Sequence, residues 1–179
     1  MGEIKPPFLV KLIVGMISAK EDLFKKVEGK MEQKFGLIDF QSSSLAFTYT
    51  RHYESEMGKN LKRKFLSFRS LIDPKEIAEV KLFTSELEQF FLYPNSKRRC
   101  INIDPGYLSF AKLVLATTKN YAHRIYLGKG IYAEVALRYE KGKGFKPLEW
   151  TYPDYKSEAY LQIFQQIREI YGQQLKEKR

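Results

Sequence analysis

The feature that most constrains the fold is a pair of alternating segments joined by Gly128-Lys129-Gly130. Residues 123–127 and 131–139 flank this connection and are rich in Ile, Tyr and Val. A three-residue connection with two glycines is typical of a β-hairpin, because glycine readily adopts the positive φ that a tight reversal requires. We therefore predict antiparallel strands over 123–139.

The two-residue period of a strand also predicts which hairpin residues share a face. In the expected register Leu127 lies opposite Ile131, with further pairs Ile125–Ala133 and His123–Val135 on the apolar face, and Tyr126–Tyr132 and Arg124–Glu134 on the other. His123 is then either a core-edge histidine with one satisfied ring nitrogen or a ligand-binding group. The Arg124–Glu134 pair either stabilises the sheet or holds the planar Arg124 guanidinium for a phosphate or carboxylate.

The chain begins with a β–α pattern. The apolar run Phe8–Ile17 is too short to span a bilayer and is interrupted by Lys11, so we interpret it as a buried strand and not as a signal peptide. Ser18 to Glu21 fits a capping box. A helix follows with an inward face and ends at Gly36; the inward residues are Leu23, Val27, Met31 and Phe35.

Further elements follow from the same periodicities. Strands are expected over 45–49, 64–72 and 101–103, with a loop or short helix over 53–61. Asp73-Pro74 begins a second helix, with Asp73 as N-cap and Glu76 completing a capping box. Its expected core face is Ile77, Val80, Leu87, Phe90 and Phe91, and Pro94-Asn95 ends it. Asp104-Pro105-Gly106 is interpreted as a turn. Residues 107–118 fit helix or strand, and a last helix covers 157–175 with Leu161, Phe164, Ile167 and Tyr171 inward.

The resulting order of elements is β-α-β-β-α-β, then a hairpin, then a C-terminal helix. This order predicts an α+β fold with a ferredoxin-like β-α-β-β-α-β core, an added β-hairpin and a C-terminal helix. The chain of 179 residues has the usual length of one domain, so we expect a single domain over 1–179.

The net charge and the cysteine content limit the partners and the location that we expect. The formal net charge is +10, which favours anionic partners such as RNA, a nucleotide or a phosphorylated small molecule; solubilising surface lysine is the alternative. Cys100 is the only cysteine, so no intramolecular disulfide can form, which fits a reducing, cytoplasmic location. We expect no membrane partner. The sequence identifies neither a cofactor nor an oligomeric state.

Several groups of residues are candidate sites. His52, Glu54 and Glu56 alternate, so on an extended strand they would share a side and suit a divalent metal; a solvated charged loop is the alternative. Trp150 begins an aromatic run that either stacks on bases or seals the core. Two basic clusters would form an anion-binding rim if both flank one cleft; they are Lys59, Lys62, Arg63 and Lys64, and Lys97, Arg98 and Arg99.

A second set of polar residues lies in the second half of the chain. Lys112 and Lys119 could bind an anion, Thr117 or Thr118 could add a hydroxyl, and Asp104 is either a turn residue or part of the same pocket. Phosphate-loop, dinucleotide-binding, zinc and nucleophile-elbow motifs are absent, which excludes the commonest motif-bearing nucleotide-binding and hydrolase classes.

The chain resembles a family of uncharacterised bacterial proteins catalogued as a domain of unknown function, some of whose members carry the label "GTP-binding protein". The segments that carry the resemblance are 56–58, 61–65, 70–74, 102–108, 112–119, 123–127, 130–135 and 150–155. The resemblance implies a full-length, single-domain member without an established activity. The chain departs from the family pattern at His52, which counts against the metal site.

Three functions remain open from the sequence. The first is a binding module for an anionic ligand, which uses a basic, aromatic-bearing surface. The second is a small-molecule enzyme with a pocket built from the region 104–134. The third is an assembly protein that pairs through its C-terminal helix or an exposed hairpin edge.

Overall fold

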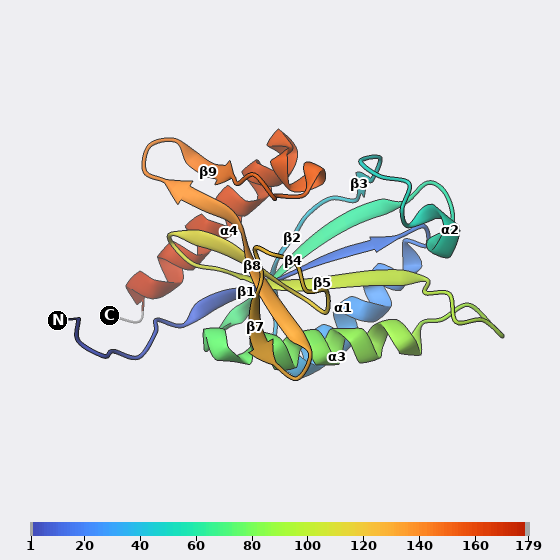
Figure 1. Ribbon diagram of the computed structural model, residues 1–179, viewed down its shortest axis with the longest axis horizontal. Coiled ribbons are helices and arrows are strands. Elements are labelled where there is room, and N and C mark those ends of the chain that lie inside the picture. The colour runs from blue at the N-terminus through green and yellow to red at the C-terminus, as the bar shows by residue number, and fades with distance from the viewer. Residues whose placement is uncertain (1, 178–179) are drawn as a thin grey trace.

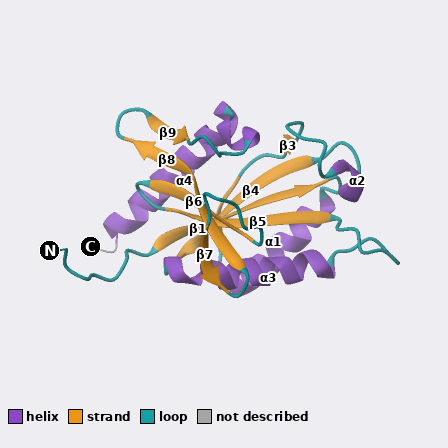
Figure 2. Ribbon diagram, viewed as in Figure 1, coloured by secondary structure: helices purple, strands orange, loops and turns teal. Residues whose placement is uncertain are grey.

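The computed structural model describes residues 2–177 and shows an α+β fold with one antiparallel sheet (Figures 1 and 2). The main path of the sheet follows the order β2-β4-β1-β5-β6-β8-β7, while β3 pairs with β4 and β9 pairs with β8. The strands are Val10–Ser18 (β1), Ile38–Gln41 (β2), Leu45–Ala46 (β3), Lys62–Ile72 (β4), Ile101–Leu108 (β5), Lys112–Thr117 (β6), Ile125–Gly128 (β7), Ile131–Glu140 (β8) and Gly144–Pro147 (β9). The α-helices are Asp22–Phe35 (α1), Glu54–Met57 (α2), Ile77–Phe90 (α3) and Glu158–Glu177 (α4), with short 3₁₀ helices at Pro74–Glu76 (η1) and Pro153–Lys156 (η2).

The helices cover the two faces of the sheet. α1 and α3 bury their apolar residues against one face, and α4 buries Tyr160, Phe164, Ile167 and Tyr171 against the other (Figure 1). The residues of β1 alternate between these two cores, as the strand period requires: Leu12 and Val14 face α1 and α3, whereas Ile13 faces α4. No helix within residues 2–177 combines the length and apolar character needed to cross a membrane.

Polar contacts also fasten α4 to the sheet. The Tyr171 hydroxyl donates to the carbonyl of Leu9 at 2.8 Å, and the Gln174 amide donates to the carbonyl of Arg69 at 3.0 Å. The Lys11 ammonium is buried and bonds Asp39 and the Gln174 side chain. Burial lowers the pKa of Lys11, and the partner Asp39 opposes that shift.

The prediction for the first helix was right in its span and its buried face, but the capping box predicted before it does not form. Leu23, Val27 and Met31 are buried, Phe35 is partly buried, and Gly36, at φ +88°, follows the last helical residue. Ser18 does not cap α1: its hydroxyl accepts from the Lys20 amide and donates to the carbonyl of Cys100. The second capping box is confirmed, because Asp73 and Glu76 form both of its hydrogen bonds at η1.

Three other expectations need correction, and one open choice is decided. The strand expected over 45–49 covers only Leu45–Ala46. Phe90 was expected in the core but is 73% exposed. Asp104-Pro105-Gly106 is not a turn, since β5 continues through it to Leu108 and pairs with β1 along its whole length. The ambiguous stretch 107–118 is strand at 107–108 and 112–117, with a short connection at 109–111.

The hairpin is confirmed, and its register is partly as expected. Ile125 pairs with Ala133 and Tyr126 with Tyr132, but an irregularity places Gly128 opposite Ile131 where Leu127 was expected. A second irregularity in the β6–β8 pairing, between Leu113 and Val114, breaks the simple alternation along β8. Glu134 and Ala136, expected on the more polar face, are both buried.

Candidate functional site

A buried ion pair lies between the start of β7 and the middle of β8. Arg124 Nε donates to Glu134 Oε2 at 2.7 Å, and the two side chains are only 1% and 2% exposed. The rest of the guanidinium is also engaged: Nη1 donates to the carbonyl of Lys119 and Nη2 to the Tyr152 hydroxyl, both at 2.9 Å. Burial alone would lower the pKa of Arg124, but the bonds to Glu134 and Tyr152 outweigh it and raise that pKa. The sequence-predicted contact therefore exists, and Arg124 has no free edge for a phosphate.

His123 belongs to the same cluster, and its predicted position opposite Val135 is wrong. The residue precedes β7, and its Nε2 lies 2.9 Å from Glu134 Oε2. Because Glu134 also neutralises a permanently charged arginine, its carboxylate acts as acceptor. His123 Nε2 therefore carries the hydrogen, and in the neutral ring Nδ1 is the acceptor.

Aromatic rings surround this pair. The His123 ring stacks on Trp150, with centroids 5.2 Å apart and 12° between the planes. The Arg124 guanidinium lies 4.5 Å from the ring centroid of Tyr121. Tyr121, Trp150 and Tyr152 are 53%, 40% and 44% exposed. We call Tyr121, His123, Trp150 and Tyr152 the aromatic platform.

The two segments that carry the platform are held by the sheet. The Thr151 hydroxyl donates to the carbonyl of Ala136 at 2.6 Å and accepts from the Leu148 amide. Trp150 Nε1 donates to the carbonyl of Val135 at 2.9 Å. On the other side, Arg124 ties the loop before β7 to Glu134 through the bond described above. Trp150 is thus bonded directly to the backbone of β8, and each of the two segments is attached to that strand.

A second polar network lies around Arg63 on β4. Arg63 is buried and donates to Asp154 at 2.8 Å and to Asp104 at 3.4 Å. To reach Asp104 on β5, its guanidinium crosses β1 at Gly15, where an added Cβ would lie 2.9 Å from Arg63 Nη1. Asn102 donates to the same Asp104 oxygen at 2.6 Å.

The network continues to the free edge of β5. Arg99 donates to Glu56 through Nε and Nη2, and to Glu88 through Nη1 at 2.9 Å. Glu88 in turn accepts from the Ile103 amide at 2.6 Å, and Lys81 donates to the Ile103 carbonyl at 2.9 Å. β6 pairs with β5 only from Gly106 onward, so these two side chains of α3 take the place of a neighbouring strand at Ile103. Burial raises the pKa of Glu88, and the Lys81 charge opposes that shift.

The charges of this second network nearly cancel. Three cations, Arg63, Lys81 and Arg99, face four carboxylates, Asp104, Asp154, Glu56 and Glu88, so the formal sum is 3 − 4 = −1. Burial raises the pKa of Tyr53. The charges of the surrounding groups also shift this pKa, which places Tyr53 close to Asp104, Arg63, Tyr152 and Arg99. A network with this balance gives an anion no net attraction.

The two predicted basic clusters do meet at one end of the molecule, beside α2. Arg98 Nε donates to the carbonyl of Glu56, and the Tyr93 hydroxyl donates to the carbonyl of Met57. Lys20 and Arg98 both lie over the Tyr93 ring. Arg63 and Arg99, however, point inward and are occupied by carboxylates, which leaves the exposed cations Lys59, Lys97 and Arg98 in those clusters.

Other predicted site residues lie apart. Lys112 is exposed at the far end of β6, five residues from Thr117, which is roughly 16 Å along an extended strand. His52, Glu54 and Glu56 do not alternate on a strand, because α2 begins at Glu54, and Glu56 is occupied by Arg99. Within residues 2–177 no group of three or more His, Cys, Asp and Glu side chains is arranged to hold a metal ion.

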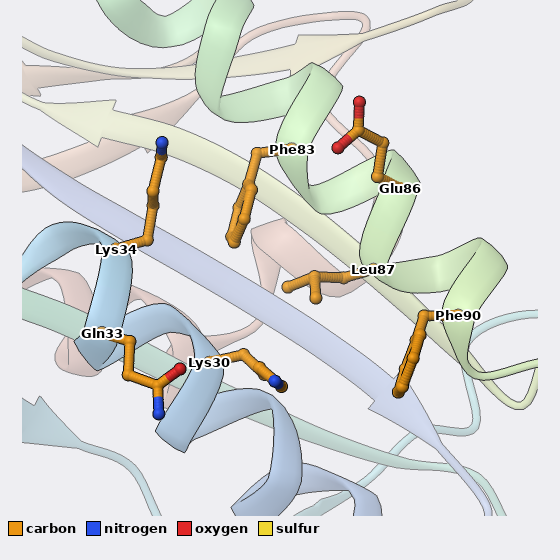
Figure 3. Close-up of a pocket in the computed structure, with 7 residues that line it drawn as sticks. All are labelled: Lys30, Gln33, Lys34, Phe83, Glu86, Leu87 and Phe90. Atoms are coloured by element: carbon orange, nitrogen blue, oxygen red, sulfur yellow. The ribbon is translucent and has the colours of Figure 1, made fainter.

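The cavities lie elsewhere. A groove of about 400 Å³ runs between α1 and α3, where Phe83 and Phe90 point toward Lys30 and Lys34 across it (Figure 3). A second, of about 460 Å³, is lined by Glu21, Asp22, Phe24, Lys25, Ser42–Ser44 and Lys64. Asp104, Lys119, Arg124 and Glu134 line neither of them. Asp104 belongs to the Arg63 network, whereas Lys119, Arg124 and Glu134 meet at the aromatic platform.

Sequence reasoning missed Glu88 and Lys81. Both lie on the buried stripe of α3 together with Ile77, Val80, Thr84 and Leu87. Two charged residues at core spacing were the signal that could have identified them, because charged side chains are rarely buried without partners.

Comparison with known proteins gives one match. The model of a family described as "Domain of unknown function (DUF4416)" matches residues 9–171. No curated protein and no solved structure matches the chain.

Proposed function

The chain belongs to the DUF4416 family, a domain of unknown function, and from that premise we propose that it binds a nucleotide or RNA on the aromatic platform. The observation that carries the proposal is the platform itself. Four rings from two separate segments are gathered around the buried Arg124–Glu134 pair, and three of the rings are 40–53% exposed.

The platform suits a planar base. Rings that are already held, as Trp150 is by Val135 and His123 by Glu134, lose little freedom when a ligand stacks on them. Stacking of a base on an aromatic side chain typically contributes about 1–3 kcal/mol. Exposed aromatic rings on fixed anchors therefore favour a ligand with a flat aromatic group.

The phosphate groups of the ligand need cations that are not already paired. Arg124 is excluded by its bonds to Glu134, Lys119 and Tyr152, whereas the Lys119 side chain is exposed beside the platform. The net charge of +10 adds a general attraction for polyanions. We infer that Lys119 supplies the direct phosphate contact and that Thr117 or Thr118 adds a hydroxyl.

Fluorescence of Trp150 tests this proposal, because it is the only tryptophan in the chain. ATP and a short oligouridine RNA would be titrated separately, with inorganic triphosphate as a ligand that has no base. We expect the two base-containing ligands to change the Trp150 emission, and RNA binding to weaken steeply as salt is raised. If ATP binds more tightly than oligouridine, the ligand is a mononucleotide; if oligouridine binds more tightly, it is RNA.

Matched variants locate the binding surface. Tyr121→Ala should weaken binding by about 5- to 160-fold, which corresponds to the loss of one stacking contact of roughly 1–3 kcal/mol. Phe110→Ala is the control, since Phe110 is also an exposed aromatic that contacts an arginine, but at the opposite end of β6. No binding by any base-containing ligand, or an equal loss in both variants, would refute the platform.

One observation also favours an enzyme acting on the same ligand. Glu134 fixes the His123 ring with Nε2 as donor, which leaves Nδ1 available as a general base. His123→Gln keeps a hydrogen-bond donor toward Glu134 but has no basic nitrogen. If the protein turns over bound nucleotides, that variant should keep the Trp150 response and lose product formation. Absence of product with the unaltered protein would exclude this candidate alone.

We further infer a ferredoxin-like core and a cytoplasmic location. The order β2-β4-β1-β5, with α1 and α3 on one face, supports the first inference. The single, buried cysteine supports the second, since a reducing compartment disfavours disulfides.

A further inference from the structure

The outer edge of β7 is an unusual surface. β7 is the last strand on the main path of the sheet, so its outer side has no strand neighbour within residues 2–177. Three consecutive residues there are exposed: Ile125 by 71%, Tyr126 by 59% and Leu127 by 41%. A bare sheet edge with apolar side chains is a ready template for another strand.

Other edges of the same sheet are protected. The free stretch of β5 at Ile103 is covered by the charged side chains of Lys81 and Glu88. The short edge strand β9 ends in Lys146 and Pro147, a charge and a residue without an amide hydrogen. β7 contains neither a charged residue nor a proline, which indicates that another strand covers its edge.

The charges around β7 favour a second copy of this chain as the cover. Two copies of a chain with net charge +10 repel each other over most of their surfaces. At β7 the strand itself is uncharged, Arg124 is buried against Glu134, and Lys129 is bonded to Glu79. The edge is thus a neutral, apolar strip on a basic protein, where two copies can meet without unpaired like charges.

We propose that the protein forms a two-fold homodimer through antiparallel pairing of β7 with β7 of a second copy. A two-fold axis brings the same surface of each copy together, and antiparallel pairing of identical strands satisfies that symmetry. The sheets of the two copies then continue into each other. Because β7 has only four residues, its exposed side chains, Tyr126 above all, supply much of the buried area. This proposal does not depend on nucleotide binding.

Sedimentation equilibrium over a range of protein concentrations tests the dimer. We expect twice the chain mass at micromolar concentration, with Ile125→Lys shifted to monomer by at least tenfold in dissociation constant, because each copy would then place a lysine charge in the apolar strip that its partner covers. Phe90→Lys is the matched control: Phe90 is 73% exposed in the α1–α3 groove, and the change in charge is the same. This variant should dimerise like the unaltered chain.

Salt and cross-linking give independent readouts. Dimerisation should hold or tighten as salt is raised, because salt screens the repulsion between basic chains, whereas RNA binding weakens. Tyr126→Cys should form an intermolecular disulfide on mild oxidation, since the other cysteine, Cys100, is buried. A monomer at all concentrations, which would leave the edge to a strand of another protein, overturns the proposal. So does a dimer that survives Ile125→Lys, or one that is lost instead in Phe90→Lys.

Discussion

Gly15 is where the absence of a side chain lets the second polar network form. The Arg63 guanidinium crosses β1 at this residue, and an added Cβ would lie 2.9 Å from Arg63 Nη1 and 3.0 Å from Phe65 Cε1. Arg63 is buried and bound to Asp154, so it cannot move away without leaving a charge unpaired. We expect Gly15→Ala to lower the free energy of unfolding by about 1–3 kcal/mol.

Urea denaturation measures this effect, and the chain offers a matched control. Gly29 lies exposed within α1, and an added Cβ there meets no atom within 4 Å. Gly29→Ala should therefore raise stability by roughly 0.5–1 kcal/mol, because alanine is the better helix former. Equal effects of the two substitutions would show that Arg63 does not need the space above Gly15.

At the same scale, the sequence predicted one ion pair and missed the others for a physical reason. Arg124 and Glu134 were paired correctly because they face each other across one hairpin, whose register follows from local alternation. The partners of Arg63 are 41 and 91 residues away along the chain. No local pattern fixes such contacts, since they depend on the order of the strands in the sheet.

Among the elements, β5 was the least predictable from the sequence. Asp104-Pro105-Gly106 has the composition of a turn, but pairing with β1 holds it extended. The Ile103 amide points away from β1 toward Glu88, so two residues later Pro105 lacks an amide on the same open side, where none is needed. Gly106 is required because β6 passes close: an added Cβ would lie 2.3 Å from the carbonyl oxygen of Val114. Tertiary contacts thus overrode the turn composition.

The free edge of β5 gives a prediction for the element. The Ile103 amide donates to Glu88, a charged acceptor on α3, and not to a strand. Glu88→Ala should speed hydrogen exchange at the Ile103 amide by about 10- to 100-fold, as expected for losing a hydrogen bond to a charged group of roughly 1.5–3 kcal/mol. Amide exchange followed by NMR would measure it.

Glu86→Ala is the control for that experiment, since Glu86 is exposed on the same helix and makes the same change in helix propensity. It should leave the Ile103 amide protected. If both variants left exchange at Ile103 unchanged, Glu88 would not be what closes the edge of β5.

For the whole molecule, buried tyrosines predict a loss of stability in alkali. Burial raises the pKa of Tyr53, Tyr155 and Tyr160, the last to about 12. Above about pH 10 the unfolded chain loses these protons while the folded chain keeps them, so the folded state binds more protons and its stability falls as pH rises. Burial lowers the pKa of Lys11, so between its folded pKa and 10.5 this residue makes the stability rise with pH. The effect of three tyrosines is larger than that of one lysine.

Urea denaturation from about pH 8 to about pH 11 would show this fall, roughly 1.4 kcal/mol per pH unit for each tyrosine once the unfolded chain is ionised. Tyr160→Phe should make the fall shallower. The hydroxyl of Tyr160 is buried and has no hydrogen-bond partner within residues 2–177, so its removal breaks no such bond there. Stability that stayed level up to pH 11 would count against buried, protonated tyrosines.

The attachment of α4 also has a consequence for the time at which the molecule can fold. Tyr171 bonds the carbonyl of Leu9 across 162 residues, and Gln174 bonds that of Arg69 across 105. While α4 is still being synthesised, β1 and β4 have therefore already left the ribosome with one apolar face uncovered. Contacts this distant in sequence are slow to form. Until α4 emerges, the nascent chain exposes Ile13 and Phe65, which α4 covers in the folded protein, so we expect these two side chains to favour aggregation during synthesis.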